Sequence, residues 1–96
     1  MILWIDDIRK PPSDKNYFWV KSTNQAITAL KACIFEYIDI DHDAGLYAKD
    51  GGDYIKVLDW LEMNNISYNI RIHSMNPVGR MNMRRIINKN NWKELV

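Results

Sequence analysis

Ile38-Asp39-Ile40-Asp41-His42-Asp43-Ala44-Gly45 places three acidic residues and a histidine at the end of an apolar run, just before a glycine. In α/β proteins, ligands usually bind at the edge of the sheet where the parallel strands have their carboxyl ends. We therefore expect a buried strand from about Phe35 to Asp41 that opens into a loop with reactive side chains. This strand is the centre of the predicted fold.

Two other strand-like runs also lead into polar residues. Residues 2–5 are wholly apolar and precede Asp6 and Asp7, which indicates a buried strand with two carboxylates at its end. Residues 69–73 alternate between polar and apolar side chains and lead into Ser74. Because the carboxyl ends of parallel strands meet at one edge of a sheet, the three strand ends predict a single shared site.

The remaining elements follow from strand composition and helix caps. Residues 17–21 are rich in aromatic and β-branched side chains and predict a fourth strand. A capping box of Ser22 and Gln25 begins a helix that runs to about Ala32. Asp53 is expected to cap a second helix, which has an apolar stripe along one side. The stripe consists of Tyr54, Val57, Leu58 and Leu61.

The last quarter of the chain predicts a third helix. Asn76 stands at the cap position and Pro77 at the first helical position, and the helix is expected to run to about Asn88. Its predicted core face consists of Val78, Met81, Ile86 and Ile87. Residues 92–96 are compatible with a last helical turn or with a short edge strand.

These elements predict one α/β domain over residues 1–96, with a mainly parallel sheet of about four strands and crossover helices. Strands that are buried on both faces should be apolar throughout, but residues 38–40 and 70–72 alternate. The segment after the first strand contains Pro11 and Pro12, which exclude a regular helix. We therefore expect a three-layer or partly open sandwich with one sheet face partly uncovered.

The charge distribution is uneven although the net charge is only +1, which argues against a general polyanion binder. Residues 1–70 contain seven Lys or Arg and eleven Asp or Glu. Residues 71–96 contain six Lys or Arg and only one acidic residue. An acidic site facing a basic segment suits a metal-bound phosphate ester. The alternative is a solvated helix face.

Nothing in the chain indicates export or insertion into a membrane. No apolar run approaches the roughly 20 residues of a membrane span, and acidic residues follow the first apolar run at once. Cys33 is the single cysteine, so it cannot form an internal disulfide, and beside Ile34 and Phe35 it is expected to be buried. These features favour a cytoplasmic protein.

The carboxylates at the strand ends are candidate metal ligands. Mg²⁺ favours a few carboxylates together with waters and a substrate phosphate. In an extended strand, Asp41 and Asp43 lie on one side and His42 on the other. We expect a site for Mg²⁺ or Mn²⁺ whose ligands are Asp6, Asp7, Asp41 and Asp43. The alternatives are that the first pair caps a turn and that Asp41 is a nucleophile on phosphorus.

The other polar residues at the strand ends suit proton transfer and phosphate binding. His42 and His73 are candidate general acids and bases or metal ligands. Ser74 is expected to contact a phosphate oxygen or to donate to a leaving oxygen. Asn76 caps the third helix, whose first backbone N–H groups can bind an anion. Arg80 can bind a phosphate with two N–H groups, or it is an ordinary surface arginine.

The order of these residues resembles the two-component receiver domain. The pair Asp6-Asp7 follows the first strand, Asp41 the third and Ser74 the fourth. The resemblance implies that the pair binds Mg²⁺, that Asp41 accepts a phosphoryl group and that Ser74 contacts it. Receivers also have a lysine at the end of a fifth strand, and neither Lys89 nor Lys93 stands in that context.

A closer resemblance is to the cyclic-phosphate processing receiver-like family. It rests on residues 3–12, on residues 40–43 before a glycine, and on the long segment 73–83, and together they cover nearly the whole chain. The resemblance implies a truncated receiver-like, flavodoxin-like domain and the processing of cyclic phosphate ends, for which RNA is the expected source. Ala44 and residues 52–54 depart from the family pattern.

The combined prediction is a metal-dependent phosphoesterase acting on cyclic phosphates, such as 2′,3′-cyclic ends of RNA or nucleotides. In this hypothesis the histidines share proton transfer, while Ser74, Asn76 and Arg80 stabilise charge on the phosphate. One alternative is a signalling receiver with Asp41 as phosphoacceptor. Another is a phosphate- or nucleotide-binding module without catalysis. The partly uncovered sheet face also makes a homodimer an expectation.

Overall fold

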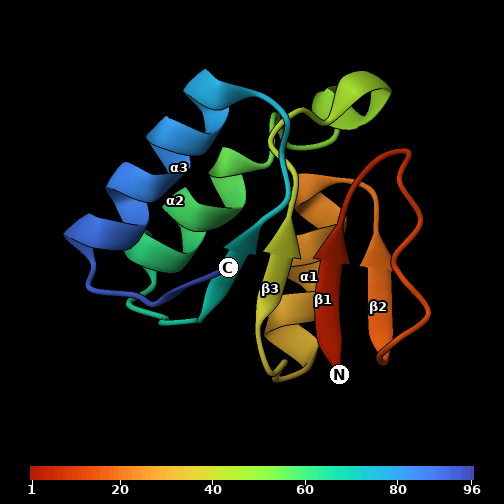
Figure 1. Cartoon of the computed structure of the whole chain (residues 1–96), viewed down its shortest axis with the longest axis horizontal. Coiled ribbons are helices and arrows are strands. Elements are labelled where there is room, and N and C mark those ends of the chain that lie inside the picture. The colour runs from red at the N-terminus through yellow and green to blue at the C-terminus, as the bar shows by residue number, and fades with distance from the viewer.

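The computed structural model describes all 96 residues and contains one five-stranded sheet and three α-helices (Figure 1). In chain order the elements are β1 (Ile2–Ile5), β2 (Tyr17–Val20), α1 (Thr23–Ala32), β3 (Ile38–Ile40), the 3₁₀ helix η1 (Gly45–Lys49), α2 (Ile55–Met63), β4 (Ile70–Ile72), α3 (Pro77–Lys89) and β5 (Glu94–Leu95). All strand pairs are parallel, and the strand order is β2-β1-β3-β4-β5. This order is that of a flavodoxin-like α/β fold.

The sheet has one strand more than predicted. The fifth strand, β5, is the C-terminal segment that was compatible with a turn or an edge strand, and it pairs with β4 through Glu94 and Leu95. It is only two residues long, so it has no alternation that a sequence pattern could reveal. Conversely, β3 is shorter than the predicted run from Phe35 to Asp41, because residues 33–37 form an irregular connection from α1 and the strand ends at Ile40.

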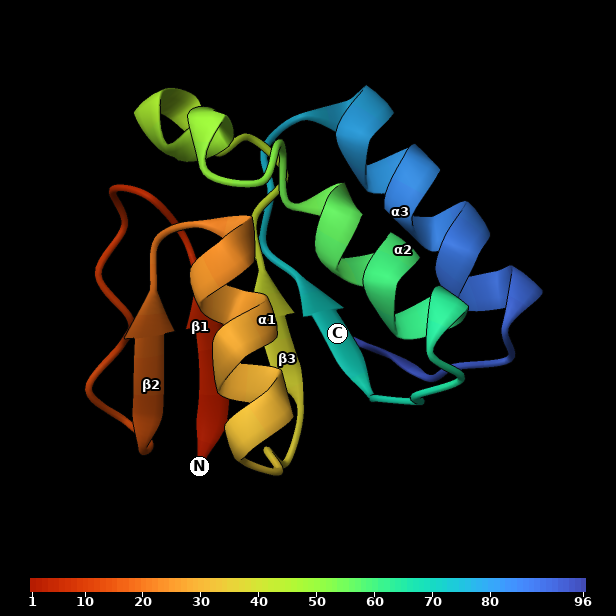
Figure 2. The same cartoon turned by 180° about the vertical axis from the view of Figure 1, so that it is seen from behind.

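The three helices all lie against the same face of the sheet. Figure 1 shows the strands in front of α1, and Figure 2, turned by 180°, shows the helices in front of the strands. The β1–β2 connection runs from residue 6 to residue 16 without a helix, as its two prolines predict. The prediction of an incompletely covered sheet is confirmed. The structure has two layers, one of strands and one of helices, and is the partly open form of the predicted architecture, not the three-layer form.

The apolar core lies between the sheet and the helices. The strands contribute alternate residues, among them Leu3, Ile38 and Ile70, and each of these is fully buried. The predicted stripe of α2 is confirmed, because Tyr54, Val57, Leu58 and Leu61 are all fully buried.

The predicted core face of α3 was partly wrong. Ile87 is buried, but Val78 and Met81 are 60% and 47% exposed. The buried residues of this helix are Gly79, Met83 and Ile87, which follow one another at intervals of four. The predicted face was therefore displaced around the helix axis, because glycine at position 79 carries no apolar side chain to signal the true face.

Helix caps and the cysteine test the local predictions further. Ser22 and Asn76 accept hydrogen bonds from the backbone N–H groups of Gln25 and Gly79, as predicted for N-caps. Asp53 does not cap α2, since its Oδ1 accepts from the backbone N–H of Ala44, 3.0 Å away, in the preceding loop. Cys33 is exposed, contrary to expectation, because α1 ends at Ala32 and its apolar side faces elsewhere.

None of the helices has the length and apolar character that a membrane span requires.

Candidate functional site

Three carboxylates meet at the carboxyl edge of the sheet. β1 and β3 are neighbours, with Ile5 in register with Ile40, so the residues that follow them lie side by side. The backbone N–H of Asp41 donates to the carbonyl of Ile5 across 3.0 Å. One carboxylate oxygen from each of Asp6, Asp7 and Asp41 lies within 4.8 Å of the others. The structure thus brings together side chains that are 35 residues apart in the sequence.

Asp6 is the buried member of this carboxylate cluster, which we define as Asp6, Asp7 and Asp41. Its Oδ1 accepts from the backbone N–H groups of Ile8 and Arg9 at 2.9 and 2.7 Å. Its Oδ2 lies 2.9 Å from Nε2 of His73. Burial alone would raise the pKa of Asp6, but these backbone donors and His73 together hold the pKa below its usual value. Asp6 is therefore an anion in a fixed orientation.

Asp7 is in the opposite electrostatic situation. Burial raises its pKa, and the nearby charges of Asp6 and Asp41 raise it further. Its Oδ2 is directed at Gly45, which has a positive φ of 56° and no room for a Cβ. No ion pair is formed by Asp7 or Asp41. Two of the three close carboxylates in the cluster, Asp7 and Asp41, thus have no cationic partner, whereas Asp6 faces His73.

This donor set fits a divalent cation. Hard cations such as Mg²⁺ are held by few carboxylate oxygens together with water and substrate oxygens. Asp43, the fourth predicted ligand, does not join the cluster. It lies with His42 and Asp53 in a separate group, and its side chain is 60% exposed. The alternation predicted for residues 41–43 does not hold, because β3 already ends at Ile40.

His42 lies between the cluster and the start of α3. Its Nδ1 is 3.0 Å from Oδ1 of Asp43, and this contact is the main cause that lowers the pKa of Asp43. The ring lies directly on Gly79, where a Cβ would come within 2.7 Å of Cδ2. Its side chain is 15% exposed, and Nε2 has no hydrogen bond to the protein. His42 therefore keeps one ring nitrogen for a ligand.

His73 is placed differently from the sequence expectation. Its side chain is only 5% exposed, and both ring nitrogens face carboxylates, Nδ1 toward Asp39 at 2.6 Å and Nε2 toward Asp6 at 2.9 Å. The indole of Trp4 stacks on the ring at a centroid distance of 4.1 Å and an interplanar angle of 5°. Both ring nitrogens of His73 are therefore engaged by protein carboxylates, whereas His42 has one nitrogen without a protein partner.

The predicted phosphate-binding residues lie at the start of α3. Ser74 is 3% exposed, and its Oγ accepts from the backbone N–H of Asn76 at 3.1 Å. Asn76 uses Oδ1 as the helix cap and directs Nδ2 toward Asp43 at 3.4 Å. Arg80 directs Nη1 at the carbonyl oxygens of Ile72 and Ser74. Ser74 keeps its hydroxyl hydrogen as a donor, whereas Arg80 already has structural partners.

Sequence reasoning missed Asp39, which contacts His73 from the uncovered face of the sheet, and its ion-pair partner Arg71. Asp39 is in the middle of β3 and is 1% exposed, and Arg71 Nη1 contacts its two oxygens at 3.3 and 3.2 Å. The alternation of residues 38–40 predicts a partly uncovered sheet face, and Asp39 on that face is nevertheless buried. The signal that could have indicated this ion pair is the acid Asp39 in one strand and the base Arg71 in the next, which lie in register.

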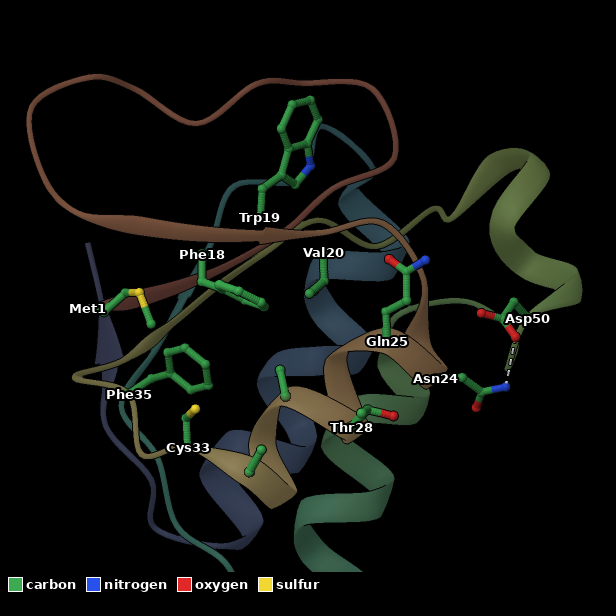
Figure 3. A pocket seen from close by; sticks show the side chains of 12 residues that line it. Met1, Phe18, Trp19, Val20, Asn24, Gln25, Thr28, Cys33, Phe35 and Asp50 are labelled. Atoms are coloured by element: carbon green, nitrogen blue, oxygen red, sulfur yellow. Dashed lines mark hydrogen bonds between the residues drawn. The ribbon is translucent and has the colours of Figure 1, made fainter.

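A separate cavity of about 580 Å³ lies between β2 and α1, and no member of the carboxylate cluster lines it (Figure 3). Phe18, Val20, Cys33 and Phe35 make its wall mainly apolar. The only ionisable carboxylate on its lining is Asp50, which accepts hydrogen bonds from Ser22 and Asn24. The cavity therefore has no group arranged for the chemistry described above.

Comparison with known protein families gives one match. The family described as the cyclic-phosphate processing receiver domain matches residues 1–89 of the chain. No curated protein and no solved structure matches it. The matched range contains every residue of the carboxylate cluster and the start of α3.

Proposed function

The chain belongs to the family of cyclic-phosphate processing receiver domains, and from this membership we propose that it is a metal-dependent phosphoesterase that opens cyclic phosphates. The 2′,3′-cyclic phosphate end of an RNA is the proposed substrate. The observation that supports this proposal is the carboxylate cluster, with three oxygens within 4.8 Å and a raised pKa at Asp7.

Asp6, Asp7 and Asp41 would hold Mg²⁺ or Mn²⁺. Such an ion, when bound, supplies positive charge for the phosphoryl oxygens and lowers the pKa of a coordinated water. The chain's own part is to hold the three carboxylates in place. Asp6 is fixed by three hydrogen bonds, and Asp41 by a backbone hydrogen bond from its own N–H and another from His42 to its Oδ1.

His42 is the proposed proton carrier. Opening a cyclic phosphate requires that one proton is removed from the attacking water and one is delivered to the leaving oxygen. Asp43 accepts from Nδ1 of His42, so in the neutral ring the lone pair is on Nε2, the nitrogen without a protein partner. This arrangement favours His42 over His73, whose two nitrogens are both engaged.

The start of α3 is the proposed phosphate contact. α3 has 13 residues, and its N-terminus carries partial positive charge toward the loop that contains Ser74 and Asn76. The hydroxyl of Ser74 would donate to a phosphate oxygen. Arg80 strengthens the positive charge of this region, although its Nη1 is bonded to backbone carbonyls.

The experiment is to incubate the protein with a short RNA that ends in a 2′,3′-cyclic phosphate, with Mg²⁺ or Mn²⁺, and to read the end group by mass. We expect ring opening with turnover in excess of protein. Asp41→Asn should reduce the rate by at least about a hundredfold, and His42→Ala by a similar factor, in line with the 10² to 10⁴ attributed to general acid–base groups.

Asp59→Asn is the matched control, because Asp59 is an exposed carboxylate on α2 whose partner is Lys56 at 4.0 Å. It should retain the wild-type rate. An unopened ring with both metals would contradict the proposal for RNA ends. Acetyl phosphate labelling of Asp41 without turnover would instead support a phosphoacceptor, the alternative implied by the receiver-like order of the carboxylates.

A further inference from the structure

Asp39 is a buried carboxylate outside the cluster, and the mechanism above gives it no task. It is the central residue of β3, in register with Trp4 of β1 and Arg71 of β4. Its side chain points to the face of the sheet without helices, yet it is only 2% exposed. A carboxylate in such a position must be compensated by hydrogen bonds and charges, because burial disfavours an isolated anion.

The compensation comes chiefly from His73. Nδ1 of His73 lies 2.6 Å from Asp39, and the opposite nitrogen, Nε2, lies 2.9 Å from Asp6. Each ring nitrogen therefore lies within hydrogen-bond distance of one carboxylate. The imidazole is thus a rigid bridge that begins at Asp39 in the sheet and ends at a member of the carboxylate cluster.

The bridge cannot rotate freely. Trp4 stacks on one side of the ring with nearly parallel planes, and its own Nε1 donates to the carbonyl of Arg9 at 2.7 Å. The stacked indole fixes the plane of the ring, and Asp39 fixes its rotation within that plane. Nε2 is then directed at Oδ2 of Asp6, while Oδ1 of Asp6 is held by Ile8 and Arg9.

From this geometry we propose that Asp39 is a positioning residue, which acts through His73 to fix the carboxylate of Asp6 in the cluster. The proposal rests on the proposed function in one respect, namely that the cluster binds a divalent cation. Groups that orient a metal ligand commonly change metal affinity by 10- to 100-fold when they are removed.

The first measurement uses the metal-free protein, so that it does not depend on the proposed function. NMR spectra of the wild type should show the His73 ring N–H protons protected from exchange, together with the amide signals of Ile8 and Arg9. In Asp39→Asn we expect the ring N–H signals to be lost and both amide signals to move. Unchanged signals in a folded variant would overturn the proposal.

The second measurement separates positioning from a simple loss of charge. Mn²⁺ affinity is measured by calorimetry for the wild type, for Asp39→Asn, for His73→Gln and for the double variant. We expect Asp39→Asn to weaken binding by about 10- to 100-fold in the wild-type background and by less than about twofold in the His73→Gln background. Equal weakening in both backgrounds would mean that Asp39 acts through its charge, and would overturn the proposal.

Arg71→Met is the matched control, because Arg71 also contacts Asp39 but does not contact His73. It removes a partner whose side chain is 43% exposed but leaves the contact between Asp39 and His73 in place. Its Mn²⁺ affinity should stay within about twofold of the wild type, and its ring N–H signals should persist. If the wild type binds no Mn²⁺, the proposed function fails, and the metal-free NMR comparison still decides whether Asp39 positions Asp6.

Discussion

Two glycines are in contact with the side chains that define the candidate site. Gly45 lies against the carboxylate of Asp7, and Gly79 lies under the ring of His42. In each place a Cβ would overlap a functional side chain. The backbone therefore approaches the site closely at two points, and these points restrict where Asp7 and His42 can lie.

Gly79→Ala should displace His42. Alanine is normally more favourable than glycine inside a helix by about 1 kcal/mol, but here the added Cβ meets the imidazole, so the free energy of unfolding should fall by about 1 to 3 kcal/mol. Cyclic-phosphate turnover should fall as in His42→Ala, while Mn²⁺ affinity should not change. Urea unfolding and calorimetry measure these effects, with Val78→Ala as the exposed neighbour. A more stable variant with full turnover would contradict the described contact.

Asp7→Asn should have opposite effects with and without metal. The raised pKa of Asp7 means that its ionised form is disfavoured in the folded protein, so at neutral pH its charge lowers the free energy of unfolding. The metal-free variant should therefore be more stable by about 0.5 kcal/mol, the size of a partly exposed charge interaction. Thermal unfolding at pH 7 provides the measurement.

The same variant should lose stabilisation by metal. In the wild type, Mn²⁺ at a hundred times its Kd should add about 2.7 kcal/mol, which corresponds to roughly 10 to 20 °C in Tm for a domain of this size. Asp7→Asn should show little of this shift, whereas Asp59→Asn should show all of it. An equal shift in all three proteins would place the metal elsewhere.

At the scale of elements, an ion pair joins the short strand β5 to α3. Arg84 of α3 forms two hydrogen bonds to Glu94 of β5, from Nε at 2.7 Å and from Nη2 at 2.8 Å. The hydrogen bond from Arg84 is the main cause that lowers the pKa of Glu94. The pair therefore links β5, which is only two residues long, to the helix that precedes it.

Arg84→Met should therefore destabilise the protein in a pH-dependent way. Because the folded pKa of Glu94 lies below its ordinary value of 4.5, the stabilisation is complete above that value and is lost as the pH falls through the folded pKa. We expect the substitution to lower the free energy of unfolding by about 1 kcal/mol at pH 7, limited by the solvent exposure of Arg84. Below pH 4.5 the difference between variant and wild type should become smaller as the pH falls. Urea unfolding of the variant and of Arg85→Met at several pH values tests this. A loss that is constant with pH would show that the pair contributes through packing alone.

At the scale of the whole molecule, one face of the sheet has no helices. Figures 1 and 2 show the three helices on the other side. The uncovered face includes Arg71, and next to it lies a cavity of about 530 Å³ to which Tyr17, Tyr37 and Lys93 also contribute. Part of this face is closed by the segment between β1 and β2, since Trp4 is only 2% exposed.

A homodimer through this face remains a prediction. Light scattering over a range of protein concentrations should give a mass that rises from about 11.4 kDa toward twice that value. Tyr17→Glu would place a charge on the face and should shift the mass back to the monomer. A monomer mass at every concentration would contradict the prediction.

Several local features could be predicted from the sequence, because each depends on neighbours within one helical turn or one strand. They are the strand ends, the caps at Ser22 and Asn76, and the apolar stripe of α2. The meeting of Asp6, Asp7 and Asp41 was also predictable, since parallel strands end at the same edge. The burial of His73 between Asp6 and Asp39 was decided only by the tertiary structure, and so was the separation of Asp43 from the cluster. Both depend on which strands are neighbours and where β3 ends, and neither property is present in any local pattern of the chain.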